Sequence, residues 1–428
     1  MPVIVKSFGC RLNALEAAKI EIVASRAGLT DALIFNTCAV TGEAEAQARQ
    51  AIRKAARENP GARIFVVGCG ADRNPDGFAK LPNVAAVIKN ADKFTPESYN
   101  PTPPLRGSRQ GEAEPVGGQN ITIEKCGQFS KGFVQIQTGC NYACTYCIVH
   151  TLRGPARSFD YDAILAQTKQ LTSSGYSEIT LTGVDIASYK FPSPVMVGQG
   201  PDHPGHKSRD SGLLSLIQKL LTDDPDIQRL RLSSLDPAHD WSDLIKLMKE
   251  NPRLMPHLHL SMQSGSDEIL RLMARRHRIA DILKLPPCGK VGGFAAGGGS
   301  ITFSVDIITG FPGETDELFQ ETLATLEKLR PIRIHAFPFS PRPGTPAATF
   351  PNQVPKSVAK DRVRELNALG TKFLNEFMVS QLGRPTQVLM ERGGVGRTPN
   401  DIEFLFDAPE GAILTLTPTE IKDAKFKA

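Results

Sequence analysis

The stretch FVQIQTGCNYACTYC (133–147) decides how the middle of this chain folds. Its first six residues contain Phe, Val and Ile and predict a buried strand. The remainder carries cysteines with the spacing C-x3-C-x2-C, namely Cys140, Cys144 and Cys147. On a helix these thiols would share one face and pack as a stripe in a core, but Gly139 and Asn141 between them are poor helix formers. We therefore expect an irregular loop whose thiols bind a metal group.

The number of thiols in this loop favours an iron–sulfur cluster over zinc. Structural zinc sites are built from paired C-x2-C units that supply four ligands, and the sequence has no second pair. A 4Fe-4S cluster takes its thiolates from short cysteine runs such as this one. Three thiolates leave one iron without a protein ligand, and such an open position binds a substrate or cofactor directly.

The residues around the loop, from 126 to 376, repeat a pattern of strand and helix. The strand candidates are 133–138, 178–183, 229–234, 257–262, 302–310 and 333–340. Helical patterns such as 161–175 and 315–330 lie between most of them. Six repeats are two fewer than in a full eight-unit barrel, so we expect a partial (β/α)6 barrel with its active site at the carboxyl ends of the strands.

The first 94 residues predict a separate open parallel α/β sheet. Continuous apolar strands at 3–8, 32–37, 63–68 and 83–88 alternate with helical patterns. Cys10, Cys38 and Cys69 follow the first three strands directly. The carboxyl ends of parallel strands share one edge, where ligands bind, so these thiols should converge. A shared metal site explains the pattern better than three unrelated buried thiols.

The remaining segments complete the expected organisation. Residues 95–125 are rich in Pro and Gly and predict a linker, and short strands within 377–428 predict a small β-barrel. Residues 190–212 read as a flexible insertion. The Gly- and Pro-rich segment 284–300 stands where a barrel helix is expected.

The composition excludes several classes of protein. The formal net charge of +5 is too small to identify a nucleic-acid binder by itself, so binding to a polyanion must depend on local patches. No apolar run is long enough for a membrane span, and the first residues do not read as a signal peptide, so we expect a cytoplasmic protein. Cys126 and Cys288 stand alone and are expected to be buried free thiols.

The cysteine loop, with the aromatic Tyr146 before its last thiol, resembles the radical S-adenosylmethionine (SAM) superfamily. The wider chain resembles the methylthiotransferases of that superfamily, and residues 377–428 are similar to their RNA-binding TRAM barrel. The segments that carry the likeness include SFGCRLNALEA (7–17), NTCAVTGEAEAQAR (36–49), VVGCGA (66–71), RGPARS (153–158), LTGVDIASY (181–189), QSGSDEIL (263–270) and DIITGFPGETDELF (306–319).

The resemblance implies two 4Fe-4S clusters and a use for each. Cys140, Cys144 and Cys147 would hold the cluster that binds SAM and cleaves it to a 5′-deoxyadenosyl radical. Cys10, Cys38 and Cys69 would hold an auxiliary cluster that carries the sulfur. The product would be a methylthio group on C2 of a modified adenosine in the anticodon loop of tRNA. An external one-electron reductant and a sulfur donor are then required, and we expect a monomer.

The spellings FGCRLN and RGPARS are similar to the branch that modifies N6-threonylcarbamoyladenosine (t6A) at tRNA position 37. Branches that act on isopentenyladenosine in tRNA or on a ribosomal protein stay open as alternatives. A third possibility is a metal-stabilised RNA-binding protein without catalysis. A fourth, an electron carrier, is disfavoured because such proteins usually complete four cysteine ligands.

Further candidate residues lie near the expected carboxyl ends of the barrel strands. The residues assigned to SAM or substrate are Tyr146, Gly183, Ser233, Gln263 and Asp306. Turn formation explains Ser233, Gln263 and Asp306 equally well, and core packing is the alternative for Tyr146. Arg153 and Arg157 flank the loop and are expected either to pair with a phosphate or with the SAM carboxylate or to be surface residues without a role. The run ARRHR (274–278) is a candidate phosphate patch.

Overall fold

The structure is a computed structural model of the whole chain. It describes residues 3–9, 11–40, 42–100, 123, 130–191, 212–289 and 300–428. Cys10 and Cys126, most of the expected linker and most of the 190–212 insertion lie outside the described residues.

The chain divides into two compact units, and the cysteine loop is shared between them. The first unit comprises Met1–Gly127, Thr138–Tyr142 and Cys147–Phe159, and the second comprises Gln128–Gln137, Ala143–Tyr146 and Asp160–Ala428. Two of the loop's three cysteines, Cys140 and Cys147, therefore belong with the N-terminal unit, whereas Cys144 belongs with the barrel unit. The domain boundaries expected from the sequence remain predictions.

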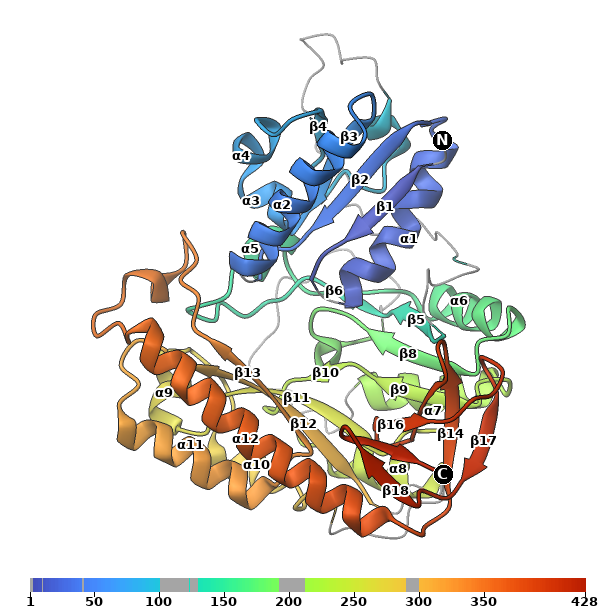
Figure 1. Cartoon of the computed structure of the whole chain (residues 1–428), viewed down its shortest axis with the longest axis vertical. Helices are drawn as coiled ribbons and strands as arrows, with labels where there is room; N and C mark the ends of the chain where they lie inside the picture. The colour runs from blue at the N-terminus through green and yellow to red at the C-terminus, as the bar shows by residue number, and fades with distance from the viewer. Residues whose placement is uncertain are drawn as a thin grey trace, which may run out of the picture. The chain divides into compact units, whose positions relative to one another are not determined.

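The six strands that the sequence predicts in the second unit are present as seven, because the predicted strand 229–234 is divided into two, and all are parallel within two sheets (Figure 1). One sheet has the order β5-β8-β9 and the other β10-β11-β12-β13. The strands are β5 (Gly132–Gln135), β8 (Glu178–Thr182), β9 (Arg229–Leu232), β10 (Ser234–Leu235), β11 (His257–Gln263), β12 (Thr302–Thr309) and β13 (Arg333–Pro338). The short strands β6 (Gln137–Thr138) and β7 (Arg157–Ser158) lie on either side of the cysteine loop in sequence. In the described part of the chain these pairings leave each sheet open.

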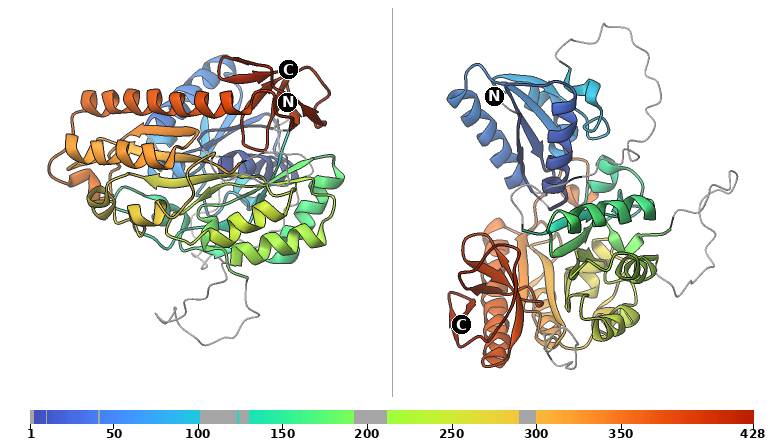
Figure 2. Two further views of the ribbon diagram at one scale, coloured as in Figure 1. Left: turned by 90° about the horizontal axis from the view of Figure 1, so that it is seen from below. Right: turned by 90° about the vertical axis from the view of Figure 1, so that its right-hand side faces the viewer.

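Helices follow most of these strands, as the periodicity predicts. They are α6 (Tyr161–Ser173), α7 (Gly212–Asp223), α8 (Ser242–Glu250), α9 (Asp267–Leu272), α10 (Ile279–Ile282), α11 (Asp316–Leu329) and α12 (Lys356–Gln381), with 3-10 turns η2 (Ile186–Ser188) and η3 (Pro346–Thr349). Helix α11 begins where the Thr315 hydroxyl accepts a hydrogen bond from the Leu318 N–H, a standard N-cap. Helix α12 packs along β13 (Figure 2).

The segment between α10 and β12 departs from the barrel pattern as expected. Residues 283–289 form turns and loop, and 290–299 lie outside the described residues. Cys288 is buried there, and its sulfur accepts a hydrogen bond from the Phe303 N–H at 3.3 Å. Burial raises the pKa of the Cys288 thiol to about 12, so this thiol is inert at neutral pH. Its interpretation as a structural free thiol is confirmed.

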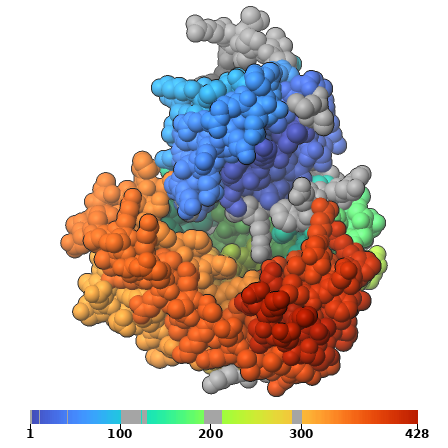
Figure 3. Space-filling view, viewed as in Figure 1, coloured from blue at the N-terminus to red at the C-terminus, as the bar shows by residue number. Residues whose placement is uncertain are grey.

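The C-terminal residues form a six-stranded sheet with the order β17-β14-β15-β16-β19-β18. Its strands are β14 (Thr386–Glu391), β15 (Val395–Arg397), β16 (Glu403–Leu405), β17 (Ile413–Leu416), β18 (Glu420–Lys422) and β19 (Lys425–Lys427). The sequence predicts β14, β16 and β17 and misses β15, β18 and β19, which have three residues each. In the space-filling view these red residues lie directly against the rest of their unit (Figure 3).

The N-terminal unit is a parallel four-stranded sheet with the order β1-β2-β3-β4, as predicted. Its strands are β1 (Ile4–Ser7), β2 (Ala32–Thr37), β3 (Arg63–Gly68) and β4 (Val84–Val87). Its helices are α1 (Arg11–Arg26), α2 (Gly42–Glu58), α3 (Cys69–Arg73), α4 (Pro75–Ala79) and α5 (Val149–Arg153), with the 3-10 turn η1 (Pro96–Tyr99).

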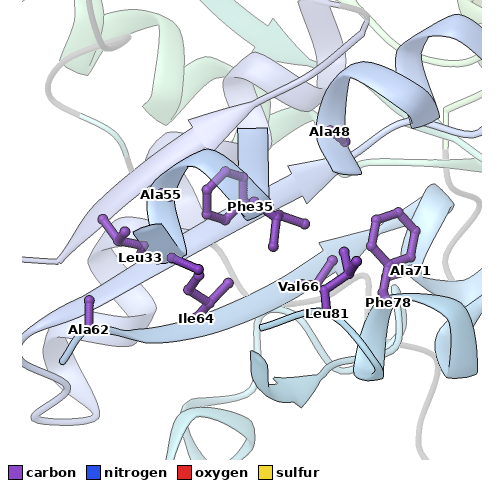
Figure 4. Packing of buried hydrophobic residues seen from close by; sticks show 12 residues of the cluster. Leu33, Phe35, Ala48, Ala55, Ala62, Ile64, Val66, Ala71, Phe78 and Leu81 are labelled. Carbon is purple, nitrogen blue, oxygen red and sulfur yellow. The ribbon is translucent and has the colours of Figure 1, made fainter. Parts of the chain in front are cut away.

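Both faces of this sheet are covered, which explains why its strands read as continuous apolar runs. Ile34 of β2 packs with Ile20 of α1 on one face. Leu33 and Phe35 point to the other face and pack with Ala48 and neighbouring residues of α2 (Figure 4). The sheet is therefore a rigid base for the loops at its carboxyl edge.

No helix in the described residues is both long and apolar enough to cross a membrane.

Candidate metal centres and cofactor site

Two of the predicted auxiliary thiols lie buried at the carboxyl edge of the N-terminal sheet. Cys38 follows β2 and Cys69 opens α3 directly after β3, and their exposed fractions are 4% and 6%. Gly9, which precedes Cys10, packs so tightly on Cys38 that a Cβ atom at this glycine would lie 2.6 Å from the Cys38 Sγ. A Cβ atom at Gly70 would lie 3.0 Å from the Cys38 carbonyl oxygen. The chain segments that follow β1, β2 and β3 therefore meet at Gly9, Cys38 and Gly70.

The first part of the cysteine loop is fastened to the segment that follows it. Gly139 has φ +73°, and a Cβ atom there would lie 1.9 Å from the Pro155 carbonyl oxygen, so only glycine fits. The Cys140 N–H donates to the Gly154 carbonyl at 3.0 Å. The Asn141 Oδ1 atom accepts a hydrogen bond from the Ala156 N–H at 2.8 Å. These contacts explain why the sequence RGPA stands so close to the cysteines.

The middle of the loop, from Ala143 to Tyr146, is held by the barrel unit instead. The Thr145 hydroxyl donates to the Leu272 carbonyl at 2.8 Å, and the Thr145 N–H donates to the Met273 carbonyl at 3.1 Å. Tyr146 packs edge-on against Phe311, with ring centroids 6.4 Å apart. Tyr146 is thus a packing residue of the loop, and its role in SAM binding remains a prediction.

The thiols have surroundings that suit thiolate ligands. The sulfur of Cys38 accepts a hydrogen bond from the Val40 N–H, and the sulfur of Cys147 accepts one from the Val149 N–H, both at 3.4 Å. The Arg275 guanidinium lies 3.8 Å from the Cys144 sulfur. Hydrogen bonds and cations beside sulfur favour the charged form and tune the potential of a bound cluster.

The described cysteines do not form a preassembled metal site. Among the residues that the structure describes, no three His, Cys, Asp or Glu side chains are grouped closely enough to hold a metal ion. No disulfide joins the described cysteines to one another, and the chemistry of the donors fits an iron–sulfur cluster. The assignment of Cys10, Cys38, Cys69, Cys140, Cys144 and Cys147 as ligands stays a prediction.

Gly183 follows β8 and is required by packing. A Cβ atom there would lie 2.8 Å from the Gln137 carbonyl oxygen and 2.9 Å from a methyl group of Ile186. The Gln137 side-chain oxygen accepts hydrogen bonds from the N–H groups of Val184 and Asp185, at 3.1 and 2.8 Å. Gln137 therefore shapes the loop after β8, a role that the sequence analysis missed.

Two further candidates sit where the strands are interrupted. Ser233 is the single residue between β9 and β10, and its buried hydroxyl has no hydrogen-bond partner. Gln263 ends β11 at a register shift against β12, with φ +71°. Such left-handed backbone is uncommon outside glycine and gathers at functional sites, which supports a ligand role for Gln263.

Asp306 was expected near a strand end, and that placement is wrong. It lies within β12, and its carboxylate accepts a hydrogen bond from His259 Nε2 at 2.9 Å. His259 Nδ1 lies 2.8 Å from the Ser304 hydroxyl, which in turn lies 3.0 Å from Nε2 of the buried His257. Asp306 is therefore the outer end of a polar chain along β11 and β12, and its contact with SAM remains a prediction.

The structure adds a charged cluster that the sequence analysis missed. Asp185, Asp236 and His239 follow β8 and β10, and Arg276 pairs with Asp236 at 3.1 Å. Burial and the charge of Asp236 raise the pKa of Asp185. Asp185 Oδ2 and His239 Nε2 are buried and have no partner among the residues that the structure describes, as polar groups at a ligand site often are before the ligand binds. Acidic residues directly after two predicted strands were the available signal.

The run 274–278 is not an open phosphate patch. Arg275 and Arg276 share Asp236, and the Arg275 side chain is only 10% exposed. His277 is fully buried, and burial together with Arg275 lowers its pKa to about 4. Two of the four ionisable side chains in this run, Arg275 and His277, thus face inward, whereas Arg276 and Arg278 are exposed.

Neither expectation for Arg153 is correct. Its guanidinium is 5% exposed and forms a two-pronged ion pair with Glu16, with distances of 2.8 and 3.0 Å. The residue is therefore neither an idle surface arginine nor open to a phosphate.

Comparisons with known proteins agree with this arrangement. The family described as the Radical SAM superfamily matches residues 134–326, and the Uncharacterized protein family UPF0004 matches residues 2–89. The chain is 37% identical to the threonylcarbamoyladenosine tRNA methylthiotransferase MtaB of Rickettsia prowazekii, over 94% of this chain and 90% of the relative. It is 31% identical to a tRNA-2-methylthio-N(6)-dimethylallyladenosine synthase of Corynebacterium efficiens, over 99% of this chain and 81% of the relative.

A solved structure shares the fold. The radical S-adenosylmethionine methyltransferase TsrM from Kitasatospora setae, with cobalamin and a [4Fe-4S] cluster bound, superposes with a TM-score of 0.53. The match covers 81% of this chain and 74% of TsrM at 12% identity. At that identity the likeness concerns the fold alone.

Proposed function

Because the chain belongs to the radical SAM methylthiotransferase family, we propose that it converts t6A at position 37 of tRNA to its 2-methylthio derivative. The observation that carries this proposal is the meeting of Gly9, Cys38 and Gly70 at one sheet edge, in addition to the separate cysteine loop at 139–147. A methylthiotransferase needs two thiolate sites, whereas a simple SAM-cleaving enzyme needs one.

The proposed cofactors are SAM and two 4Fe-4S clusters. Cys140, Cys144 and Cys147 would hold one cluster, and Cys10, Cys38 and Cys69 the other. When bound, these groups supply the radical and the sulfur that an unactivated C2 carbon of adenine requires. The protein contributes position and exclusion of water.

Several residues have positions that suit this work. The N–H groups of Val149 and Val40 donate to Cys147 and Cys38 sulfur and stabilise thiolate character. Arg275 holds a positive charge beside the Cys144 sulfur and is itself anchored by the Ser261 carbonyl at 2.8 Å. Gly183, Ser233, Gln263 and Asp306 would bind SAM or the nucleoside.

The proposal extends to domains and partners. Residues 1–94 would form the auxiliary-cluster domain, 95–125 the linker, 126–376 the radical SAM core and 377–428 an RNA-binding TRAM-like domain. The partners would be the tRNA anticodon loop, an external one-electron reductant and a sulfur donor, with the protein acting as a cytoplasmic monomer.

The decisive experiment is anaerobic reconstitution with iron and sulfide, followed by reaction with SAM, a strong reductant and tRNA that carries t6A. Mass analysis of the nucleosides should show one methylthio group added to t6A. The Cys144→Ala variant should lose both this product and 5′-deoxyadenosine. Two clusters predict about 8 iron atoms per chain.

The alternatives give different results in the same assay. Modification of isopentenyladenosine tRNA in place of t6A would assign the protein to the other tRNA branch. The Corynebacterium relative is named for that activity. SAM cleavage with no tRNA product would favour a protein substrate. Absence of both iron and SAM cleavage would leave a non-catalytic RNA-binding protein.

A further inference from the structure

A buried ion-pair cluster joins the two cysteine-bearing parts of the N-terminal unit. The Glu16 carboxylate of α1 accepts hydrogen bonds from Arg153 and lies 2.7 Å from the Lys93 ammonium. The exposed fractions of these three side chains are 2%, 5% and 2%. Burial alone would raise the pKa of Glu16, but the charges of Arg153 and Lys93 outweigh burial and lower it to about 2. Glu16 is therefore ionised, and we call these three residues the clamp.

On one side the clamp reaches the backbone that carries the auxiliary thiols. Arg153 Nη2 donates to the Asn13 side-chain oxygen at 3.1 Å. The Asn13 side-chain nitrogen donates to the carbonyls of Phe8 and Thr37, at 2.9 and 3.2 Å. Phe8 precedes Cys10 by two residues, and Thr37 precedes Cys38 by one.

Lys93 makes the corresponding link toward Cys69. Its ammonium donates to the Asn90 side-chain oxygen at 2.7 Å. The Asn90 N–H donates to the Asp72 carboxylate at 2.8 Å, and Asp72 lies on α3, the helix that Cys69 opens. The backbone before Cys10 and Cys38 is thus linked to the clamp through one side chain, Asn13. The helix that Cys69 opens is linked to it through Asn90 and Asp72.

On its other side the clamp holds the segment that follows the radical-site cysteines. Arg153 ends α5, which begins two residues after Cys147. The Asn90 side-chain nitrogen also donates to the Leu152 carbonyl at 3.4 Å. Gly154 and Pro155, the next residues, are those that fasten Gly139 and Cys140. The clamp therefore lies between the backbone of Cys140 and Cys147 and the backbone of the auxiliary thiols.

We propose that Arg153, with Glu16 and Lys93, positions the radical-site loop relative to the auxiliary thiols and so couples SAM cleavage to methylthio transfer. This inference rests on the proposed function. A buried charge cluster adds little net stability, because removing the charges from water costs about as much free energy as their attraction returns. Apolar residues of similar volume often give an equally stable protein. A bidentate arginine does fix orientation, and small displacements of reacting groups cost large factors in rate. Arg153 is a positioning residue here and not a catalytic one.

The first test measures hydrogen exchange in the full-length chain without cofactors. Arg153→Lys keeps the positive charge but loses the planar guanidinium group that donates two hydrogen bonds to the Glu16 carboxylate. We expect amides of residues 147–159 to exchange about 10-fold faster in this variant, with the sheet core unchanged. The matched control is Glu178→Gln, which removes an equally buried carboxylate from between Arg229 and Arg231 at the amino ends of β8 and β9. It should lower stability without a selective effect on 147–159.

The second test uses the reconstituted enzyme. Arg153→Lys should retain about 8 iron atoms per chain and SAM cleavage within about two-fold, because its cysteines are intact. The ratio of methylthiolated nucleoside to 5′-deoxyadenosine should fall about 10-fold or more. Glu178→Gln should leave that ratio unchanged. Asn13→Ala, which leaves the ion pairs in place, is the second variant if Arg153→Lys does not fold, and it should lower the same ratio.

The outcomes separate the clamp from the proposed function. An unchanged product ratio in both Arg153→Lys and Asn13→Ala would overturn the positioning role. Equal loss of iron, SAM cleavage and product would also overturn it, since that pattern marks a purely structural residue. If the unaltered protein cleaves SAM but modifies no t6A, the proposed function fails, and the exchange measurement still decides whether the clamp holds residues 147–159.

Discussion

Gln263 combines a functional position with an unfavourable backbone. Its φ of +71° is left-handed, and it stands at the register shift that ends β11. For residues other than glycine this conformation costs about 1–2 kcal/mol. Such a cost persists where the side chain is needed at that point, which is the argument for Gln263 as a ligand residue.

We predict that replacing Gln263 lowers activity without lowering stability. Gln263→Gly should leave the free energy of unfolding unchanged or raise it by about 1 kcal/mol, because glycine adopts this backbone freely. SAM cleavage by the same variant should fall at least about 10-fold through loss of the side chain. Urea unfolding and a 5′-deoxyadenosine assay measure the two effects. Full SAM cleavage by Gln263→Gly would show that the side chain has no such role.

Glu16 predicts how stability depends on pH. Its pKa of about 2 lies below the usual value near 4.5 because Arg153 and Lys93 outweigh the effect of burial. Stability from this group is complete above pH 4.5 and is lost as the pH falls from about 4.5 toward 2, a loss of about 3 kcal/mol.

Glu16→Gln tests this dependence. At pH 6 it should lower the free energy of unfolding of the cofactor-free chain by about 3 kcal/mol, because it leaves two buried cations without their carboxylate. Near pH 3 the gap between the variant and the unaltered chain should narrow. A gap of constant size from pH 6 to pH 3 would contradict the assignment. Glu327→Gln, at an exposed pair with Lys372, is the control and should have a small effect at both pH values.

At the scale of elements, the cysteine loop depends on a glycine that has no room for a side chain. Gly139→Ala would place a Cβ atom 1.9 Å from the Pro155 carbonyl oxygen, so the loop backbone must shift. We expect reconstituted iron to fall from about 8 to about 4 atoms per chain, with loss of SAM cleavage.

The matched control for Gly139→Ala is a substitution at Gly154, which lies next to Pro155 in the same contact. Gly154 also has positive φ, +69°, but a Cβ atom there meets nothing within 4 Å. Gly154 has ψ −166° beside its positive φ, a backbone region nearly confined to glycine, so Gly154→Ala should cost about 3 kcal/mol of backbone strain. Because no described atom stands in the way of the new Cβ, this variant should retain both clusters. Equal iron content in the two variants would show that the contact with Pro155 does not shape the loop.

The elements themselves were largely predictable. β2 (Ala32–Thr37) and β14 (Thr386–Glu391) have the bounds that hydrophobic pattern alone gives, because both are apolar runs bounded by polar or turn residues. β15, β18 and β19 were missed because these three-residue strands lie in no apolar run, whereas the equally short β16 lies in the run EFLF. The thiols at the sheet edge were predictable because parallel strands end together.

What escaped prediction depends on contacts between distant segments. Arg153 meets Glu16 across 137 positions of sequence, so no local pattern distinguishes this buried arginine from a surface one. The polar chain from His257 to Asp306 likewise depends on the register of β11 against β12. The same holds for Asp236, which pairs with two arginines of a run that the sequence presents as purely basic.

At the scale of the barrel unit, the C-terminal sheet is joined to the barrel strands through buried charge. The guanidinium groups of Arg229 and Arg231, which are 0% and 3% exposed, pair with Glu178 of β8. They also donate to the carbonyls of Arg397, Thr398 and Pro399, at 3.0 to 3.3 Å. Asn400 adds a hydrogen bond to the Ser300 carbonyl at 2.8 Å. The C-terminal residues thus provide acceptors for arginines that belong to the barrel.

Deletion of residues 384–428 should therefore destabilise the barrel as well as remove a binding surface. Two buried guanidinium groups would lose their carbonyl acceptors, at about 1.5–3 kcal/mol for each charged hydrogen-bonding group. We expect the melting temperature of the remaining chain to fall by roughly 10 °C. Replacing Arg229 by Met in the truncated chain should recover part of that loss, since it removes a buried charge that no longer has its acceptors. In the full-length chain Arg229→Met should instead be destabilising, because there it leaves the Glu178 carboxylate with fewer partners. A truncated chain that melts at the temperature of the intact one would mean that the sheet is a detachable module and that Glu178 alone satisfies both arginines.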